Sequence, residues 1–144
     1  MHNEEIKTII WLYTLDRSPC NIITNNLLRS SRNPSEIFDC QPYFRDLFKV
    51  IKTLHLTQAP LIPNQGLILY RGATASEKEI NFYKNNVGKI VMNLGFFSTS
   101  RNEKRANKFA ENLFFIIKMS HEKREKHIGH GYADISQYSQ FPDE

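Results

Sequence analysis

The chain has 144 residues, of which 40% are hydrophobic and 24% are charged, and its formal net charge is +4. These values are typical of one soluble globular domain of ordinary composition. No apolar run approaches the roughly 18 residues that a membrane span needs. Residues 1–5 lack the basic start and apolar region of a signal peptide. The sequence therefore predicts a cytoplasmic protein, or a piece of a longer one, without a membrane segment.

The mild positive charge suits either a solvated surface or a phosphate-bearing ligand. Lys and Arg are dispersed along the chain, except over residues 118–126, where Glu122 and Glu125 dilute them. Nucleic-acid binders usually concentrate their basic residues in one patch. We therefore expect no nucleic-acid partner, although a basic nucleic-acid-binding domain stays as a minor alternative.

The two cysteines, Cys20 and Cys40, have no metal-binding spacing. We expect two free thiols in a reducing compartment, with a disulfide between them as the alternative. The five histidines show no metal-like arrangement either, so the sequence predicts no metal site.

Apolar residues recur at helical spacing through the first half of the chain. Four of them predict an amphipathic helix over residues 4–14: Ile6, Ile9, Ile10 and Tyr13. A second helix is expected around residues 22–28. A third is expected to begin at Pro42, because proline fits the first turn of a helix. The expected core face of this third helix consists of Phe44, Leu47, Phe48, Ile51 and Leu54.

Short apolar runs bounded by turn residues predict strands in the second half. These strands are expected over residues 67–70, 89–93, 95–99 and 113–119, with a brief extended piece at 132–135. A helical lobe (1–58) is thus followed by a strand-rich core (66–144). The order predicts a single domain of the α+β class.

Two capping boxes are expected to start helices between these strands. Ser76 and Glu79 form the first, and Gly88 is placed to end that helix. Ser100 and Glu103 form the second, for a helix that runs through about residue 112.

Two polar residues stand out because of where the predicted strands place them. Arg71 directly follows the strand at 67–70, and its planar guanidinium can hold two phosphate oxygens at once. Gly72 would let a ligand approach the backbone closely. A surface arginine at a strand end is the alternative. Ser98 lies on the strand at 95–99 without a G-x-S-x-G elbow, so an orienting hydrogen bond is expected rather than a nucleophile.

These residues form a pattern together with the last glutamate. The pattern consists of Arg71-Gly72, the segment Phe96-Phe97-Ser98-Thr99-Ser100, and Glu144. It resembles the arginine-specific mono-ADP-ribosyltransferases of the R-S-E class, whose motifs are Arg-Gly, Phe-x-Ser-Thr-Ser and Glu-x-Glu. The resemblance extends to four further segments, at residues 11–14, 44–47, 133–136 and 141–142. With them it covers nearly the whole length of the chain.

The resemblance implies a fold, a substrate and a reaction. The fold is a helical lobe packed on a small mixed β-sandwich, here without its last strands. NAD is the substrate, and ADP-ribose passes to an arginine of an acceptor protein with release of nicotinamide. The transition state is oxocarbenium-like, as in glycoside hydrolysis. No metal is involved.

The resemblance also implies a role for each site residue. Arg71 grips the phosphates, and the backbone of Gly72 bonds the nicotinamide amide. Ser98 holds the catalytic glutamate and the ribose, while Thr99 and Ser100 support the strand end. Phe109 is a candidate for stacking on nicotinamide, with core packing as the favoured alternative.

Glu144 would be the first glutamate of the pair, which orients and deprotonates the acceptor guanidinium. The second would lie two positions beyond it. The sequence therefore predicts weak NAD binding and little or no transfer. A non-catalytic NAD-binding module of the same fold is the alternative hypothesis. A glutamate two codons beyond Glu144, followed by an apolar strand, would favour the enzyme, and a stop codon directly after Glu144 would favour the module.

Overall fold

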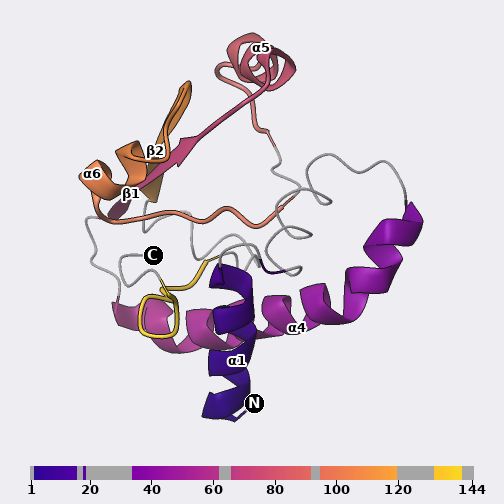
Figure 1. The fold of residues 1–144 in the computed structure, drawn as a ribbon. Coiled ribbons are helices and arrows are strands. Elements are labelled where there is room, and N and C mark those ends of the chain that lie inside the picture. Colours follow the sequence, from indigo (N-terminus) through magenta and orange to yellow (C-terminus); the bar gives the residue numbers. More distant parts are fainter. Residues whose placement is uncertain are drawn as a thin grey trace.

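The computed structural model describes residues 2–15, 18, 34–61, 66–91, 95–119 and 132–140. Within these residues the chain is a mixed α+β protein, which confirms the predicted class. Figure 1 shows α1 crossing α4 in the lower part of the view, with β1, β2 and α6 grouped above them. The elements are, in order, α1 (Asn3–Thr14), α4 (Pro34–Gln58), η2 (Ala59–Leu61), β1 (Leu67–Ala73), α5 (Glu77–Asn85), α6 (Glu103–Asn107) and β2 (Leu113–Met119).

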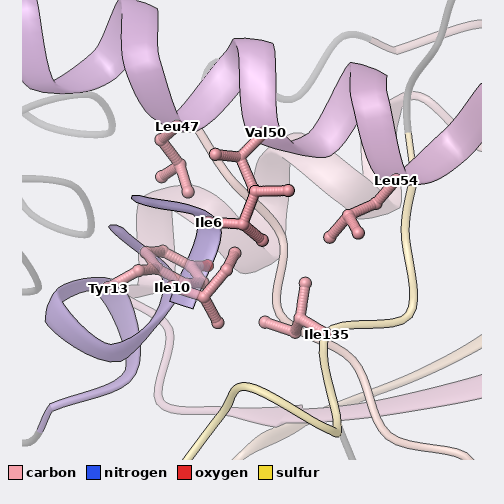
Figure 2. Close-up of a cluster of buried hydrophobic side chains, with 7 residues drawn as sticks. All are labelled: Ile6, Ile10, Tyr13, Leu47, Val50, Leu54 and Ile135. Atoms are coloured by element: carbon pink, nitrogen blue, oxygen red, sulfur yellow. The ribbon is translucent and has the colours of Figure 1, made fainter. Parts of the chain in front are cut away.

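The main core lies between α1 and α4. The helix predicted over residues 4–14 is confirmed, and it begins one residue earlier, at Asn3. Its buried side chains recur one turn apart and face those of α4, as Figure 2 shows. Ile135, from the segment that follows β2, closes the cluster. The buried members are Ile6, Ile10, Tyr13, Leu47, Val50, Leu54 and Ile135.

The start of α4 differs from the prediction. The helix begins at Pro34 rather than Pro42, and Pro42 lies inside it. Proline is tolerated at the first helical position, which Pro34 occupies. Pro42 costs the helix one backbone hydrogen bond. The helix nevertheless continues through it, and the fully buried residues Leu47 and Val50 follow five and eight residues later.

The buried face of α4 also differs from the prediction at two positions, Phe48 and Val50. Phe48 is 55% exposed, whereas Val50 is fully buried. Leu47, Val50 and Leu54 have the i, i+3, i+7 spacing of a single stripe. Phe48 follows Leu47 directly and is turned about 100° away from it around the helix axis. The predicted core position at Phe48 is therefore wrong. The helix predicted at 22–28 lies outside the described residues.

Strands β1 and β2 form an antiparallel pair with Arg71 opposite Phe115. The prediction for β2 is confirmed. The prediction for β1 is too short, because pairing with β2 continues to Ala73. Arg71 and Gly72 therefore lie within the strand rather than after it. Among the described residues this sheet has two strands.

The strands predicted at 89–93 and 95–99 do not form in the described part of the chain. Residues 89–91 and 95–99 have no ladder, and residues 92–94 lie outside the described ranges. The backbone pairs with the sheet only at Ser100, which forms an isolated bridge to Tyr70. The piece predicted at 132–135 also lacks a partner strand among the described residues.

The two predicted capping boxes have different outcomes. The first is confirmed, since the Ser76 side chain accepts from Glu79 N at the start of α5. That helix ends at Asn85, three residues before Gly88, whose φ of 80° closes the following turn. The second is wrong, because Asn102 caps α6 through a bond from the backbone N of Arg105.

Ser100 is not free to cap α6, because its backbone pairs with Tyr70 and its Oγ accepts from Asn102 N. The helix was expected to reach residue 112 and instead ends at Asn107. The turn that follows it packs across β1 and leads directly into β2.

The described residues contain no helix that is both long and apolar enough to cross a membrane. Cys40 is a free thiol, and Cys20 lies outside the described residues.

Candidate functional site

Arg71 lies in β1 and reaches across to the segment 95–100. Its Nη1 donates a hydrogen bond of 2.7 Å to the backbone carbonyl oxygen of Ser98. Its guanidinium carbon lies 4.7 Å from the centre of the Phe97 ring, which is a cation–π distance. Two of the three predicted motifs, Arg-Gly and Phe-x-Ser-Thr-Ser, are therefore in direct contact.

The segment 95–100 is held in place without belonging to a strand. The Phe96 ring meets Tyr13 of the helical core edge-on, with centroids 5.9 Å apart. The Phe97 ring meets Phe115 of β2 in the same manner, at 5.1 Å. Successive side chains thus point alternately toward the helices and toward the sheet. Ser100 completes the attachment through two backbone hydrogen bonds with Tyr70, each 2.8 Å long.

The Ser98 hydroxyl contacts a residue that the sequence did not indicate as part of the site. Ser98 Oγ lies 2.6 Å from the hydroxyl of Tyr13, at the end of α1. Tyr13 is 5% exposed and belongs to the core cluster. A buried phenol needs a hydrogen-bond partner. A tyrosine on the predicted core face of α1 therefore indicates that its hydroxyl bonds some polar group of the protein. Periodicity alone does not identify that partner.

Gly72 is required by the protein's own packing. A Cβ atom at this position would collide with the carbonyl oxygen of Ala106 and with backbone atoms of Phe109 and Ala110. The turn after α6 therefore occupies the face of β1 at Gly72. The expectation that the missing side chain makes room for a ligand is wrong for that face.

The polar backbone groups of Gly72 point elsewhere. Tyr70 exchanges both of its backbone hydrogen bonds with Ser100, on the edge of β1 away from β2. Backbone groups alternate between the two edges of a strand in an antiparallel ladder. The N–H and C=O of Gly72 are therefore directed to the same edge as those of Tyr70, where the segment 95–100 lies.

Phe109, Thr99 and Ser100 have different environments. The Phe109 ring is 59% exposed, so the expectation of core packing is wrong. Its backbone lies against Gly72, on the face of β1 opposite to the one from which the Arg71 side chain extends. Thr99 is half-buried, whereas Ser100 is buried and its hydroxyl bonds Asn102 N. Ser100 thus supports the segment.

Glu144 lies outside the described residues, as do residues 141–143. The described chain before them is anchored to α4. Gln58 Nε2 donates to Asp134 O at 2.8 Å, and Asp134 N donates to Gln58 Oε1 at 2.7 Å. The Asp134 carboxylate also bonds Arg101 at 2.8 Å. His55 Nδ1 donates to Tyr132 O at 3.0 Å.

The described residues contain no group of three or more His, Cys, Asp or Glu side chains that could hold a metal ion. Comparison of the chain with protein-family models, with curated proteins and with solved structures finds no significant match. The site is therefore defined by its own geometry: a half-buried arginine, an adjoining serine, and the edge of β1 at Gly72 that is directed toward the segment 95–100.

Proposed function

We propose that this chain is the NAD-binding part of a protein that transfers ADP-ribose from NAD to arginine side chains of an acceptor protein. The observation that carries the proposal is the bond between Arg71 Nη1 and Ser98 O. It joins the two motifs to which the resemblance gives phosphate and ribose binding. A β-sandwich of the ADP-ribosyltransferase type is part of the same proposal.

The surroundings of Arg71 suit a phosphate ligand. Contact with Phe97 fixes the plane of the guanidinium, and the bond to Ser98 O fixes its rotation. A guanidinium has five N–H donors, so a bond to Ser98 O is compatible with bonds to phosphate oxygens. An arginine held in this way loses little side-chain entropy when an anion binds.

In the proposed reaction the bond between nicotinamide and ribose C1′ breaks, and nicotinamide leaves with the bonding electron pair. A guanidinium nitrogen of the acceptor then bonds C1′ and releases its proton to a carboxylate, which we assign to Glu144. Ser98 Oγ orients the ribose and that carboxylate. Gly72 would bond the nicotinamide amide through its backbone groups, on the edge of β1 away from β2, and Phe109 would stack on the nicotinamide ring.

A non-catalytic NAD-binding module is the second candidate. The same contacts of Arg71 and Ser98 support it, because both of them concern binding rather than bond cleavage. The two functions differ in one respect: the module binds NAD without releasing nicotinamide.

Titration of the chain with NAD in a calorimeter, followed by assay of nicotinamide release with free arginine present, tests both functions. The assay is run on this chain and on a chain extended beyond Glu144 to a second glutamate. Binding with arginine-dependent release by the extended chain supports the transferase, and binding without release by either chain supports the module. Absence of NAD binding, combined with salt-sensitive binding to nucleic acid, would overturn both and favour a basic nucleic-acid-binding domain.

A further inference from the structure

We infer that Tyr13 is a positioning residue of the candidate site, whose phenol donates a hydrogen bond to Ser98 Oγ and so directs the Ser98 proton toward the bound substrate. The inference rests on the proposed function and deepens it. It starts from the 2.6 Å contact between the two hydroxyls, which links α1 to a segment 85 residues away in the chain.

The position of the Tyr13 hydroxyl is fixed by packing. Tyr13 is 5% exposed in the last turn of α1, and its ring lies in the core cluster with Ile10 and Leu47 (Figure 2). The Phe96 ring meets the Tyr13 ring edge-on, with the two ring centroids 5.9 Å apart. A tyrosine hydroxyl lies on the axis of ring rotation, so even a ring flip leaves the oxygen in place. Tyr13 therefore presents a stationary partner to Ser98.

The direction of the hydrogen bond follows from chemistry. Each hydroxyl can donate or accept. A phenol is more acidic than an alkyl hydroxyl, so Tyr13 is the better donor. When Tyr13 donates, Ser98 Oγ accepts and its own proton is left to donate onward. Hydrogen bonds in such a chain strengthen one another.

This direction is also the one that the proposed reaction needs. A carboxylate can only accept hydrogen bonds, so Ser98 must donate to orient it. If Ser98 instead donated to Tyr13, its hydroxyl proton would not be available to the carboxylate. With Tyr13 donating, Arg71 fixes the carbonyl of Ser98 and Tyr13 fixes its hydroxyl, so both polar ends of the residue are set before substrate binds.

Tyr43 provides a matched control within the same helix pair. Its hydroxyl donates to the backbone oxygen of Ile9 over 3.4 Å, and its ring packs against the same core. Both tyrosines thus tie a hydroxyl to a partner across a packed interface. Only Tyr13 touches Ser98.

The test uses Tyr13→Phe, Ser98→Ala, the double variant and Tyr43→Phe, each titrated with NAD and unfolded by heat. Tyr13→Phe keeps the ring and is expected to weaken NAD binding about fivefold. Ser98→Ala should weaken binding at least as much. The double variant should bind like Ser98→Ala alone, because Tyr13 acts through Ser98. Tyr43→Phe should keep wild-type affinity.

Two results would overturn the inference. If Tyr13→Phe binds NAD as the wild type does, or if its effect adds in full to that of Ser98→Ala, Tyr13 only packs the core while the proposed function stands. If the wild type binds no NAD, the proposed function is wrong and the role of Tyr13 falls with it. The unfolding temperatures separate these results from a loss of fold.

Discussion

Arg71 and Ser98 are 27 residues apart in the chain and are joined by a 2.7 Å hydrogen bond from the guanidinium to the backbone carbonyl. The bond crosses from β1 to a segment that belongs to no strand. The Phe97 ring beside Ser98 completes the contact with Arg71. Arg71, Ser98 and Phe97 are therefore in mutual contact, and we expect the effects of substitutions at these three residues on binding and stability to be non-additive.

The packing of α4 predicts opposite outcomes for two neighbouring residues. Leu47→Ala removes a fully buried side chain and should lower the free energy of unfolding by about 2–5 kcal/mol. Phe48→Ala truncates a side chain that is 55% exposed and should cost about 1 kcal/mol or less. Urea unfolding of the two variants measures the difference. Equal losses would show that the buried face of α4 is assigned wrongly.

Gly72 should tolerate no side chain. Gly72→Ala forces a methyl group into the backbone of the turn after α6, and we expect a loss of about 3 kcal/mol because backbone atoms cannot move aside as a flexible side chain can.

Gly88→Ala is the control for that substitution. Nothing lies within 4 Å of its Cβ position, and only its φ of +80° opposes a side chain. Left-handed backbone should cost about 1 kcal/mol there. Chemical denaturation compares the two variants. A smaller loss for Gly72→Ala than for Gly88→Ala would contradict the packing of the turn against β1.

Gln58 should hold the segment that carries Asp134. Its side-chain amide bonds both the N–H and the C=O of Asp134. Gln58→Ala should cost about 1–2 kcal/mol and should speed hydrogen exchange at the Asp134 amide. Gln41→Ala, at an exposed position of the same helix, is the control and should change neither quantity. Unchanged exchange at Asp134 in the Gln58 variant would refute the anchoring role.

The sequence predicts the parts of the fold whose stability is local or strongly periodic. The helix at 4–14 and the strand at 113–119 carry clear apolar patterns, and both predictions are confirmed. The capping box of Ser76 and Glu79 depends on residues three apart, so it is visible without tertiary structure.

Predictions that depended on tertiary contacts were less accurate. The second capping box matched the same motif, yet Ser100 is occupied by its bridge to Tyr70. The short apolar run at 95–99 predicts a strand, and the structure shows Phe96 directed toward the helices and Phe97 toward the sheet without a paired strand. No local pattern distinguishes that arrangement from a paired strand.

In the candidate site, too, the local motifs are visible in the sequence and the tertiary contacts are not. Arg71 and Ser98 were identified from motifs, and the structure brings them into contact. Tyr13 was predicted only as a core residue, because its partner is 85 residues away. The exposure of Phe109 also depends on where α6 ends. The sequence predicts an end near residue 112, whereas the helix ends at Asn107.

The central claim is that Arg71 holds the phosphates of NAD, and calorimetric titration of Arg71→Ala tests it most directly. Arg45→Ala is the matched control, because it removes the same charge from a side chain that is 67% exposed on α4. We predict that Arg71→Ala weakens NAD binding about 10- to 100-fold, since hydrogen bonds to charged groups contribute about 1.5–3 kcal/mol. Arg45→Ala should bind as the wild type does. Equal affinities for the two folded variants would contradict the account.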